Sequence, residues 1–205
     1  MTIRPQAAAN RRAPSAVAGI APGRYNFVMA VNSQPRREDG GALTTRIADE
    51  TAMAALADGL APLAVRGDVL ALRGPLGAGK TVFARAFIAA RARAAGLDPA
   101  SLGEMPSPTF TLVQSYDLPD VPVWHFDLFR LEKPEDALEL AIEEAFATAI
   151  ALIEWPEKLG ALLPAARLDL AIDFLGGDGA RQIALSGGGA WPARIAKLAA
   201  LRGVP

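Results

Sequence analysis

Short apolar runs alternate with longer segments of helical periodicity along most of the chain. The runs at 68–73 (DVLALR) and 149–153 (AIALI) are almost continuously apolar. Such runs are typical of strands that are buried on both faces of a sheet. Longer stretches repeat apolar residues three or four positions apart, and this spacing predicts helices. Strands that alternate with helices in this way predict an α/β fold whose core strands are mainly parallel.

The same pattern predicts the order of the elements. We expect strands at 43–47, 68–73, 109–116, 121–127, 149–153, 167–175 and 182–186, and helices at 50–64, 80–95, 134–146 and 191–202. Asp49 is a suitable N-cap for the first helix, and Pro134 stands in the first turn of the third. Short turns join the strand at 109–116 to that at 121–127 and the strand at 167–175 to that at 182–186, so we expect hairpins that give the sheet an antiparallel edge.

The start of the chain differs from the rest in composition. Residues 1–37 contain six arginines and no acidic residue, and they show no sustained periodicity. An Arg-rich, acid-free start resembles an organellar transit peptide, although serine is scarce. The simpler interpretation is a disordered extension over residues 1–42, followed by a single folded domain over residues 43–205.

Composition and charge narrow the class of protein. The chain contains no cysteine, which excludes disulfides and thiolate metal sites. No apolar run approaches the roughly 20 residues needed to span a bilayer. Residues 38–205 contain 15 basic and 22 acidic residues, a net charge of −7 that argues against strong autonomous binding to tRNA or other nucleic acid. These features fit a cytoplasmic protein.

Residues 74–81 (GPLGAGKT) match the phosphate-loop pattern G-x-x-x-x-G-K-[ST]. The glycines allow backbone angles that direct successive N–H groups at phosphate oxygens, and the next helix presents its positive N-terminal end to the same anion. Lys80 can reach the β- and γ-phosphates, and Thr81 offers a hydroxyl to magnesium. We therefore expect a nucleoside triphosphate with Mg²⁺. The expected contacts are Gly74, Leu76, Gly77, Ala78, Gly79, Lys80 and Thr81.

A P-loop site usually has an acidic residue at the end of a second buried strand, where it binds the metal. Glu154 ends the run 149–153, and Asp127 ends the run 121–126. The first run is typical of a central parallel strand, whereas Pro122 fits an edge or the start of a strand. We therefore favour Glu154 as the metal ligand. Asp127 would then orient water or contact the γ-phosphate, and the reverse assignment stays open.

Three weaker hypotheses concern residues near these carboxylates. Trp155 either stacks on a base or a partner or belongs to the core. His125 is the only histidine, and strand alternation places it on the same side as Asp127; a structural role is its simpler interpretation. Thr109, which follows the P-loop helix in the stretch SPT, either senses the γ-phosphate as a switch residue or belongs to an ordinary turn.

Four segments together resemble the TsaE family of bacterial tRNA threonylcarbamoyladenosine synthesis. They are GPLGAGKT (74–81), SPTFTLV (107–113), HFDLFRL (125–131) and IEWPEKL (153–159). Each segment alone is modest evidence, but their order and spacing over about residues 43–185 make the resemblance specific. The family usually has Tyr where this chain has Phe129.

The resemblance implies a small cytoplasmic ATPase that works with TsaB and TsaD, which transfer a threonylcarbamoyl group to tRNA. Binding and hydrolysis of ATP would reset the TsaB–TsaD complex, and tRNA would be contacted only through that complex. The resemblance also implies functional residues. Thr81 and Glu154 would form the metal site, Lys80 and Asp127 would join Glu154 in catalysis, and further nucleotide contacts would come from Glu50, Thr51, Trp155 and Arg181.

Two other functions stay open at the level of sequence. A small-metabolite kinase would need an acceptor pocket and usually an Arg-rich lid, and no cluster of arginines follows the P-loop helix. A nucleotide-gated binding module with negligible hydrolysis could contain the same P-loop. A screen for phosphate acceptors and a measurement of turnover would separate these functions from the ATPase.

Overall fold

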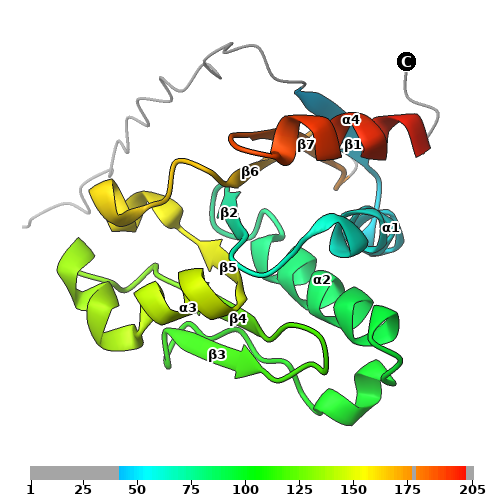
Figure 1. Cartoon of the computed structure of the whole chain (residues 1–205). Helices are drawn as coiled ribbons and strands as arrows, with labels where there is room; N and C mark the ends of the chain where they lie inside the picture. The colour runs from blue at the N-terminus through cyan, green and yellow to red at the C-terminus, as the bar shows by residue number, and fades with distance from the viewer. Residues whose placement is uncertain (1–41, 177–178, 202–205) are drawn as a thin grey trace, which may run out of the picture. The chain divides into compact units, whose positions relative to one another are not determined.

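The computed structural model describes residues 42–176 and 179–201. The expected extension therefore lies outside the described residues except for residue 42, as does the expected helix end at 202. Within the described residues, seven strands form one sheet in the order β1-β7-β6-β2-β5-β4-β3 (Figure 1). Their bounds are β1 Leu43–Ile47, β2 Val69–Arg73, β3 Val113–Tyr116, β4 Val123–Asp127, β5 Ile150–Glu154, β6 Leu168–Phe174 and β7 Arg181–Gly187.

Parallel pairing joins the four central strands. β2 pairs in parallel with both β5 and β6, and β4 pairs in parallel with β5. Antiparallel pairs flank this core, with β3 against β4 on one side and β7 and β1 beyond β6 on the other. The predicted α/β fold with mainly parallel core strands is confirmed. The antiparallel hairpins lie at both edges of the sheet. The central strand β5 is buried along its whole length.

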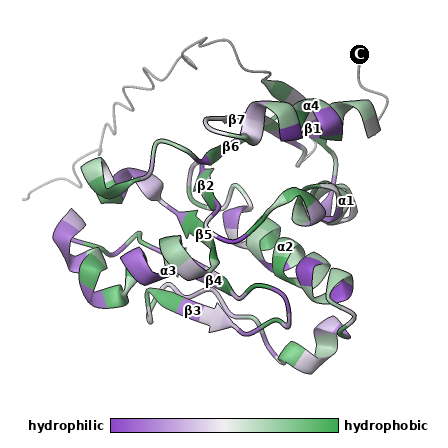
Figure 2. Cartoon of the chain, in the orientation of Figure 1, coloured by the Kyte–Doolittle hydropathy of each residue, from purple (hydrophilic) through white to green (hydrophobic). Residues whose placement is uncertain are grey.

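Helices cover both faces of the sheet. The α-helices are α1 Glu50–Leu60, α2 Lys80–Ala94, α3 Ile142–Thr148 and α4 Trp191–Leu201, and the 3₁₀ helices are η1 Ala61–Leu63, η2 Pro99–Leu102, η3 Pro134–Leu140 and η4 Pro156–Leu162. One apolar cluster joins Leu70 and Leu72 of β2 to α1, α2 and α4. A second joins Val69 of the same strand to α3 and η4. Alternate residues of β2 thus pack into two separate apolar clusters. Helix α2 carries both hydrophobic and hydrophilic residues (Figure 2).

The helix expected at 134–146 is broken, so this prediction was wrong in part. Ala141 separates η3 from α3 and has a φ of 54°, in the left-handed region that alanine rarely adopts. Ala137 and Ile142 both pack into the second apolar cluster. On one continuous α-helix, positions five residues apart point about 140° away from each other. The break allows both side chains to face the same core.

The strand expected at 109–116 begins only at Val113. Leu112 has a φ of 64°, and its N–H donates to the Pro108 carbonyl at 2.6 Å. Residues 109–112 therefore form a turn that precedes β3. The other expected elements agree with the structure to within two residues at the described ends, counting η1 with α1. No helix within the described ranges is long and apolar enough to cross a membrane.

Candidate functional site

The loop 74–79 connects β2 to α2 at the carboxyl end of the parallel strands, the position expected for a P-loop. Gly74 has a φ of 139°, and a Cβ added there would lie 2.2 Å from the Ile172 carbonyl oxygen of β6. Gly79 has a φ of 113° and is the N-cap of α2. Position 74 therefore requires glycine, because a side chain there would collide with the backbone of β6. Position 79 favours glycine because its positive φ is one that other residues rarely adopt.

Lys80 begins α2 and is only 4% exposed. Its Nζ donates to the carbonyls of Gly74 and Pro75 at 2.7 and 2.9 Å, and it lies 4.0 Å from the centre of the Trp155 ring. Burial lowers the pKa of the Lys80 amine, and the nearby carboxylates, chiefly Glu154, oppose that shift. The charged amine is thus held at the inner side of the loop, where a phosphate would neutralise it.

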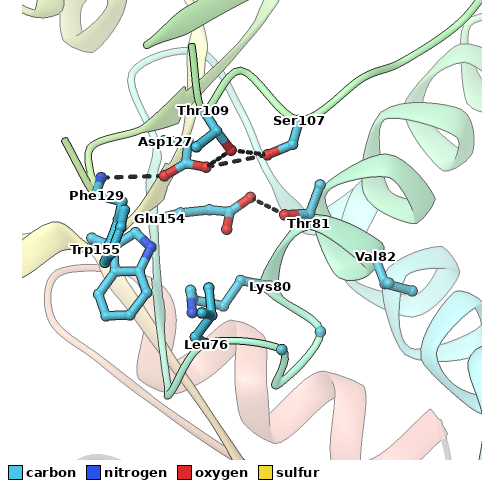
Figure 3. Close-up of a pocket in the computed structure, with 12 residues that line it drawn as sticks. Leu76, Lys80, Thr81, Val82, Ser107, Thr109, Asp127, Phe129, Glu154 and Trp155 are labelled. Atoms are coloured by element: carbon cyan, nitrogen blue, oxygen red, sulfur yellow. Dashed lines mark hydrogen bonds between the residues drawn. The ribbon is translucent and has the colours of Figure 1, made fainter. Parts of the chain in front are cut away.

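The next residue of α2 contacts the carboxylate that ends β5. Thr81 Oγ1 donates to Glu154 Oε1 at 2.7 Å (Figure 3), and Glu154 is 3% exposed. A hydroxyl and a carboxylate oxygen are ligands that Mg²⁺ prefers, with water and phosphate oxygens in its other positions. The donor set beside the P-loop therefore fits Mg²⁺.

Asp127 lies beside Glu154, because the two residues are paired in register at the ends of β4 and β5. Asp127 Oδ2 accepts hydrogen bonds from Thr109 Oγ1 at 2.6 Å and from Ser107 Oγ at 3.1 Å. Its Oδ1 accepts from the N–H of Phe129 at 3.2 Å. Asp127 thus binds the loop before β3, whereas Glu154 binds the P-loop helix.

These groups line one cavity, and Figure 3 shows them converging on it. Trp155 lies at its side in a left-handed conformation with a φ of 59°, and its ring is centred 5.0 Å from that of Phe129. The structure thus places Trp155 against the cavity and against the second apolar cluster. The lining residues are Leu76, Gly77, Gly79, Lys80, Thr81, Val82, Ser107, Thr109, Asp127, Phe129, Glu154 and Trp155.

The sequence did not point to Val82 or Phe129 as site residues. Both are apolar, so neither carries a chemical signal, and only its place within the segment HFDLFRL (125–131) distinguishes Phe129. Ser107 lay in the stretch singled out for Thr109, but its contact with Asp127 was not expected.

A second cavity lies on the other side of the P-loop. Arg181 lines it, donates from Nε to the Ala78 carbonyl at 2.9 Å, and packs with its guanidinium 4.5 Å from the centre of the Phe174 ring. The structure brings Glu50 and Arg181 to this cavity but leaves Thr51 exposed and outside its lining. The lining residues are Ile47, Asp49, Glu50, Met53, Gly77, Ala78, Gly79, Val82, Gly179 and Arg181.

His125 contacts the proposed metal ligand. Its ring is fully buried, and Nε2 lies 2.9 Å from Glu154 Oε1. The alternation of β4 placed it on the same side as Asp127, but the contact with β5 depends on the register of the two strands, which the sequence does not give.

A family model described as "Threonylcarbamoyl adenosine biosynthesis protein TsaE" matches residues 47–183, well over half of the chain. The chain belongs to the TsaE family. The resemblance carried by the four sequence motifs is therefore confirmed, and the matched range contains the P-loop, both carboxylates and Arg181.

Named relatives agree with this assignment. The tRNA threonylcarbamoyladenosine biosynthesis protein TsaE of Rickettsia bellii is 37% identical over 111 residues, which are 54% of this chain and 72% of that protein. The protein of the same name from Bacillus subtilis is 36% identical over 125 residues, 60% of this chain and 73% of that protein. The crystal structure of Bacillus subtilis YdiB shares the fold of this TsaE-family chain, with a TM-score of 0.64 and 28% identity, and the match covers 80% of this chain and 99% of that one.

Proposed function

We propose that this chain binds and hydrolyses ATP with Mg²⁺ in tRNA threonylcarbamoyladenosine synthesis, and that it resets a TsaB–TsaD complex between cycles. One observation carries the ATPase part of the proposal. The Thr81 hydroxyl and the Glu154 carboxylate are 2.7 Å apart at the start of the helix that follows the P-loop, directly beside Lys80. The place in tRNA modification rests on membership of the TsaE family.

The loop and the start of α2 would bind the phosphates. Backbone N–H groups of the loop and the positive end of α2 favour an anion there. Lys80 now donates to two carbonyls of its own loop, and it would exchange these bonds for bonds to the β- and γ-phosphates. Because burial disfavours the charged amine, the negative charge of the nucleotide would stabilise it.

Thr81 and Glu154 would hold Mg²⁺, directly or through water. When bound, the metal supplies positive charge against the β- and γ-phosphates. Asp127 differs because its oxygens accept bonds from Thr109, Ser107 and the backbone of Phe129, so it is not paired with the P-loop helix. We assign Asp127 to orienting the attacking water, a role that requires a positioned acceptor beside the cavity.

Exposed apolar side chains near the site support a protein partner. Leu76 on the P-loop is 75% exposed, Phe110 after Thr109 is 81% exposed, and Phe129 is 47% exposed. Large apolar side chains that gather on a surface often mark sites of protein contact. A partner that covered them would touch three of the four segments that line the cavity, or residues next to them, so its binding would depend on the nucleotide.

Pull-down of TsaB and TsaD by this chain, in ATP and separately in ADP, tests the proposal. We expect capture that differs between the two nucleotides, and faster ATP turnover in the presence of the partners. Lys80→Ala should lose both effects, because it removes the charge that binds the phosphates. Transfer of phosphate to a metabolite would instead indicate a kinase. Nucleotide-dependent capture without turnover would indicate a binding module.

A further inference from the structure

His125 is a buried polar residue without a structural explanation. Its Nδ1 is buried and has no hydrogen-bond partner among the described residues. A buried polar atom that lacks a partner destabilises a fold, and an apolar side chain of similar size would avoid that penalty. Packing alone therefore does not account for histidine at this position, and the one hydrogen bond that its side chain makes to the described residues needs a functional explanation.

That bond goes to the carboxylate of Glu154. A carboxylate can only accept hydrogen bonds, so the histidine Nε2, 2.9 Å from Oε1, carries the proton and donates. β4 and β5 are parallel, with His125 opposite Leu152 and Asp127 opposite Glu154. His125 therefore reaches Glu154 diagonally on one face of the sheet, a distance that long side chains can bridge.

The two donors to Glu154 converge on the same oxygen. Thr81 Oγ1 and His125 Nε2 both donate to Oε1 of Glu154. Among the described residues, Oε2 accepts no hydrogen bond. Thr81 belongs to the P-loop helix and is itself an expected metal ligand, whereas His125 does not line the cavity. His125 is thus the donor whose bond to Glu154 does not depend on the nucleotide.

We propose that His125 is a positioning residue, which fixes one oxygen of Glu154 and so directs the other toward Mg²⁺ and its water. The inference rests on the proposed function, because it assigns Glu154 to the metal. Hydrogen bonds from neighbouring groups are known to orient metal ligands, and their loss typically lowers metal affinity about 10- to 100-fold.

Two amide variants separate positioning from packing. In His125→Gln the amide nitrogen can occupy the place of Nε2 and still donate to Glu154. In His125→Asn the shorter side chain places the same group near Nδ1, too far from the carboxylate. Each variant is titrated with MgCl₂ in the presence of a fluorescent, non-hydrolysable ATP analogue, and nucleotide affinity is also measured in EDTA.

We expect His125→Asn to need about ten-fold more Mg²⁺ than the wild type, with unchanged affinity for the analogue in EDTA. His125→Gln should stay within about two-fold of the wild type, the scatter expected when a hydrogen bond is kept. Phe126→Leu is the matched control, because Phe126 is equally buried in the same strand but packs in the second apolar cluster, away from Glu154. Its Mg²⁺ dependence should equal that of the wild type.

Wild-type Mg²⁺ dependence in both amide variants, or an equal loss in both, overturns the inference. A shift in Phe126→Leu as large as that in His125→Asn overturns it as well, because general destabilisation would then explain the effect. If His125→Asn does not fold, His125→Leu takes its place, since it leaves no unpaired polar atom on the side chain. A wild type without any Mg²⁺-dependent binding would instead contradict the proposed function.

Discussion

Thr109 Oγ1 donates a 2.6 Å hydrogen bond to Asp127 Oδ2, which joins the loop before β3 to the end of β4. Both residues belong to segments that carried the resemblance to the family, and they are 18 positions apart. Asp127 therefore has two tasks, because it holds this loop and faces the cavity of the P-loop.

Asp127→Asn should lower ATP turnover about 100-fold with little change in ATP affinity. The amide keeps the size of the side chain and can still accept one hydrogen bond, but it loses the negative charge that orients water. Single-turnover hydrolysis and binding of a fluorescent ATP analogue measure the two quantities. Thr109→Val is the matched control: it removes the bond to the carboxylate but keeps the charge, so its loss of turnover should be smaller.

Glu154→Gln should weaken Mg²⁺-dependent ATP binding about ten-fold, and excess Mg²⁺ should restore part of the activity. The reason is that a neutral amide oxygen is a poorer ligand for a hard cation than a carboxylate. Titration of binding and turnover with MgCl₂ tests this in Glu154→Gln and Asp127→Asn side by side. Rescue of Asp127→Asn but not of Glu154→Gln would reverse the roles of the two carboxylates.

As the pH rises into the alkaline range, deprotonation of Lys80 should increase the stability of the nucleotide-free protein and decrease its affinity for ATP. Burial holds the pKa of Lys80 below its ordinary value of 10.5 in the folded protein. The folded chain therefore releases this proton first as the pH rises, so the stability of the nucleotide-free protein increases between the folded and unfolded pKa. ATP prefers the charged amine, so ATP affinity falls over the same range.

Unfolding by urea and ATP binding, both measured from about pH 7 to about pH 10, test this prediction within the range where a lysine with a lowered pKa titrates. Lys80→Met, which cannot titrate, is the control and should show a weaker pH dependence of both quantities. Parallel pH profiles for Lys80→Met and the wild type would show that other groups are responsible.

Gly74→Ala should destabilise the protein by about 3 kcal/mol or more, because the new Cβ would meet the Ile172 carbonyl oxygen at 2.2 Å. Gly77→Ala is the matched comparison. A Cβ at Gly77 meets nothing within 4 Å, so only its φ of 77° opposes alanine, at about 1 kcal/mol. Urea unfolding of both variants gives the two free energies. Equal losses would mean that the backbone angle, rather than the contact with β6, determines the cost.

Much of the fold could be predicted because its central strands are chemically distinctive. β2 and β5 are apolar and buried up to their last residues, Arg73 and Glu154, so their type and position were evident from the sequence. The breaks at Leu112 and Ala141 were not evident from the sequence. Both residues have a positive φ, which is usually found at glycine or asparagine, so leucine and alanine gave no sign of it. At Ala141 the break lets Ala137 and Ile142 pack in the same apolar cluster, a relationship that no local pattern indicates.

Some residues of the site could likewise be predicted from local sequence, whereas contacts between distant segments could not. Lys80 and Thr81 follow from a contiguous motif, and Glu154 and Asp127 follow from their places at the ends of apolar runs. The contact of His125 with Glu154 requires the register between two strands, which no local pattern specifies. Glu50 lines the second cavity and its neighbour Thr51 does not, and a nucleotide contact of either residue stays a prediction.

Gly74, the first residue of the phosphate loop, packs closely against Ile172 in the hairpin of β6 and β7. Arg181 makes a second attachment through its bond to the Ala78 carbonyl. Loop and hairpin are therefore mechanically coupled, although the hairpin carries none of the four motifs. ATP that immobilises the loop should slow amide hydrogen exchange in β7, so the last strand in the chain would report occupancy of a site at the centre of the sheet.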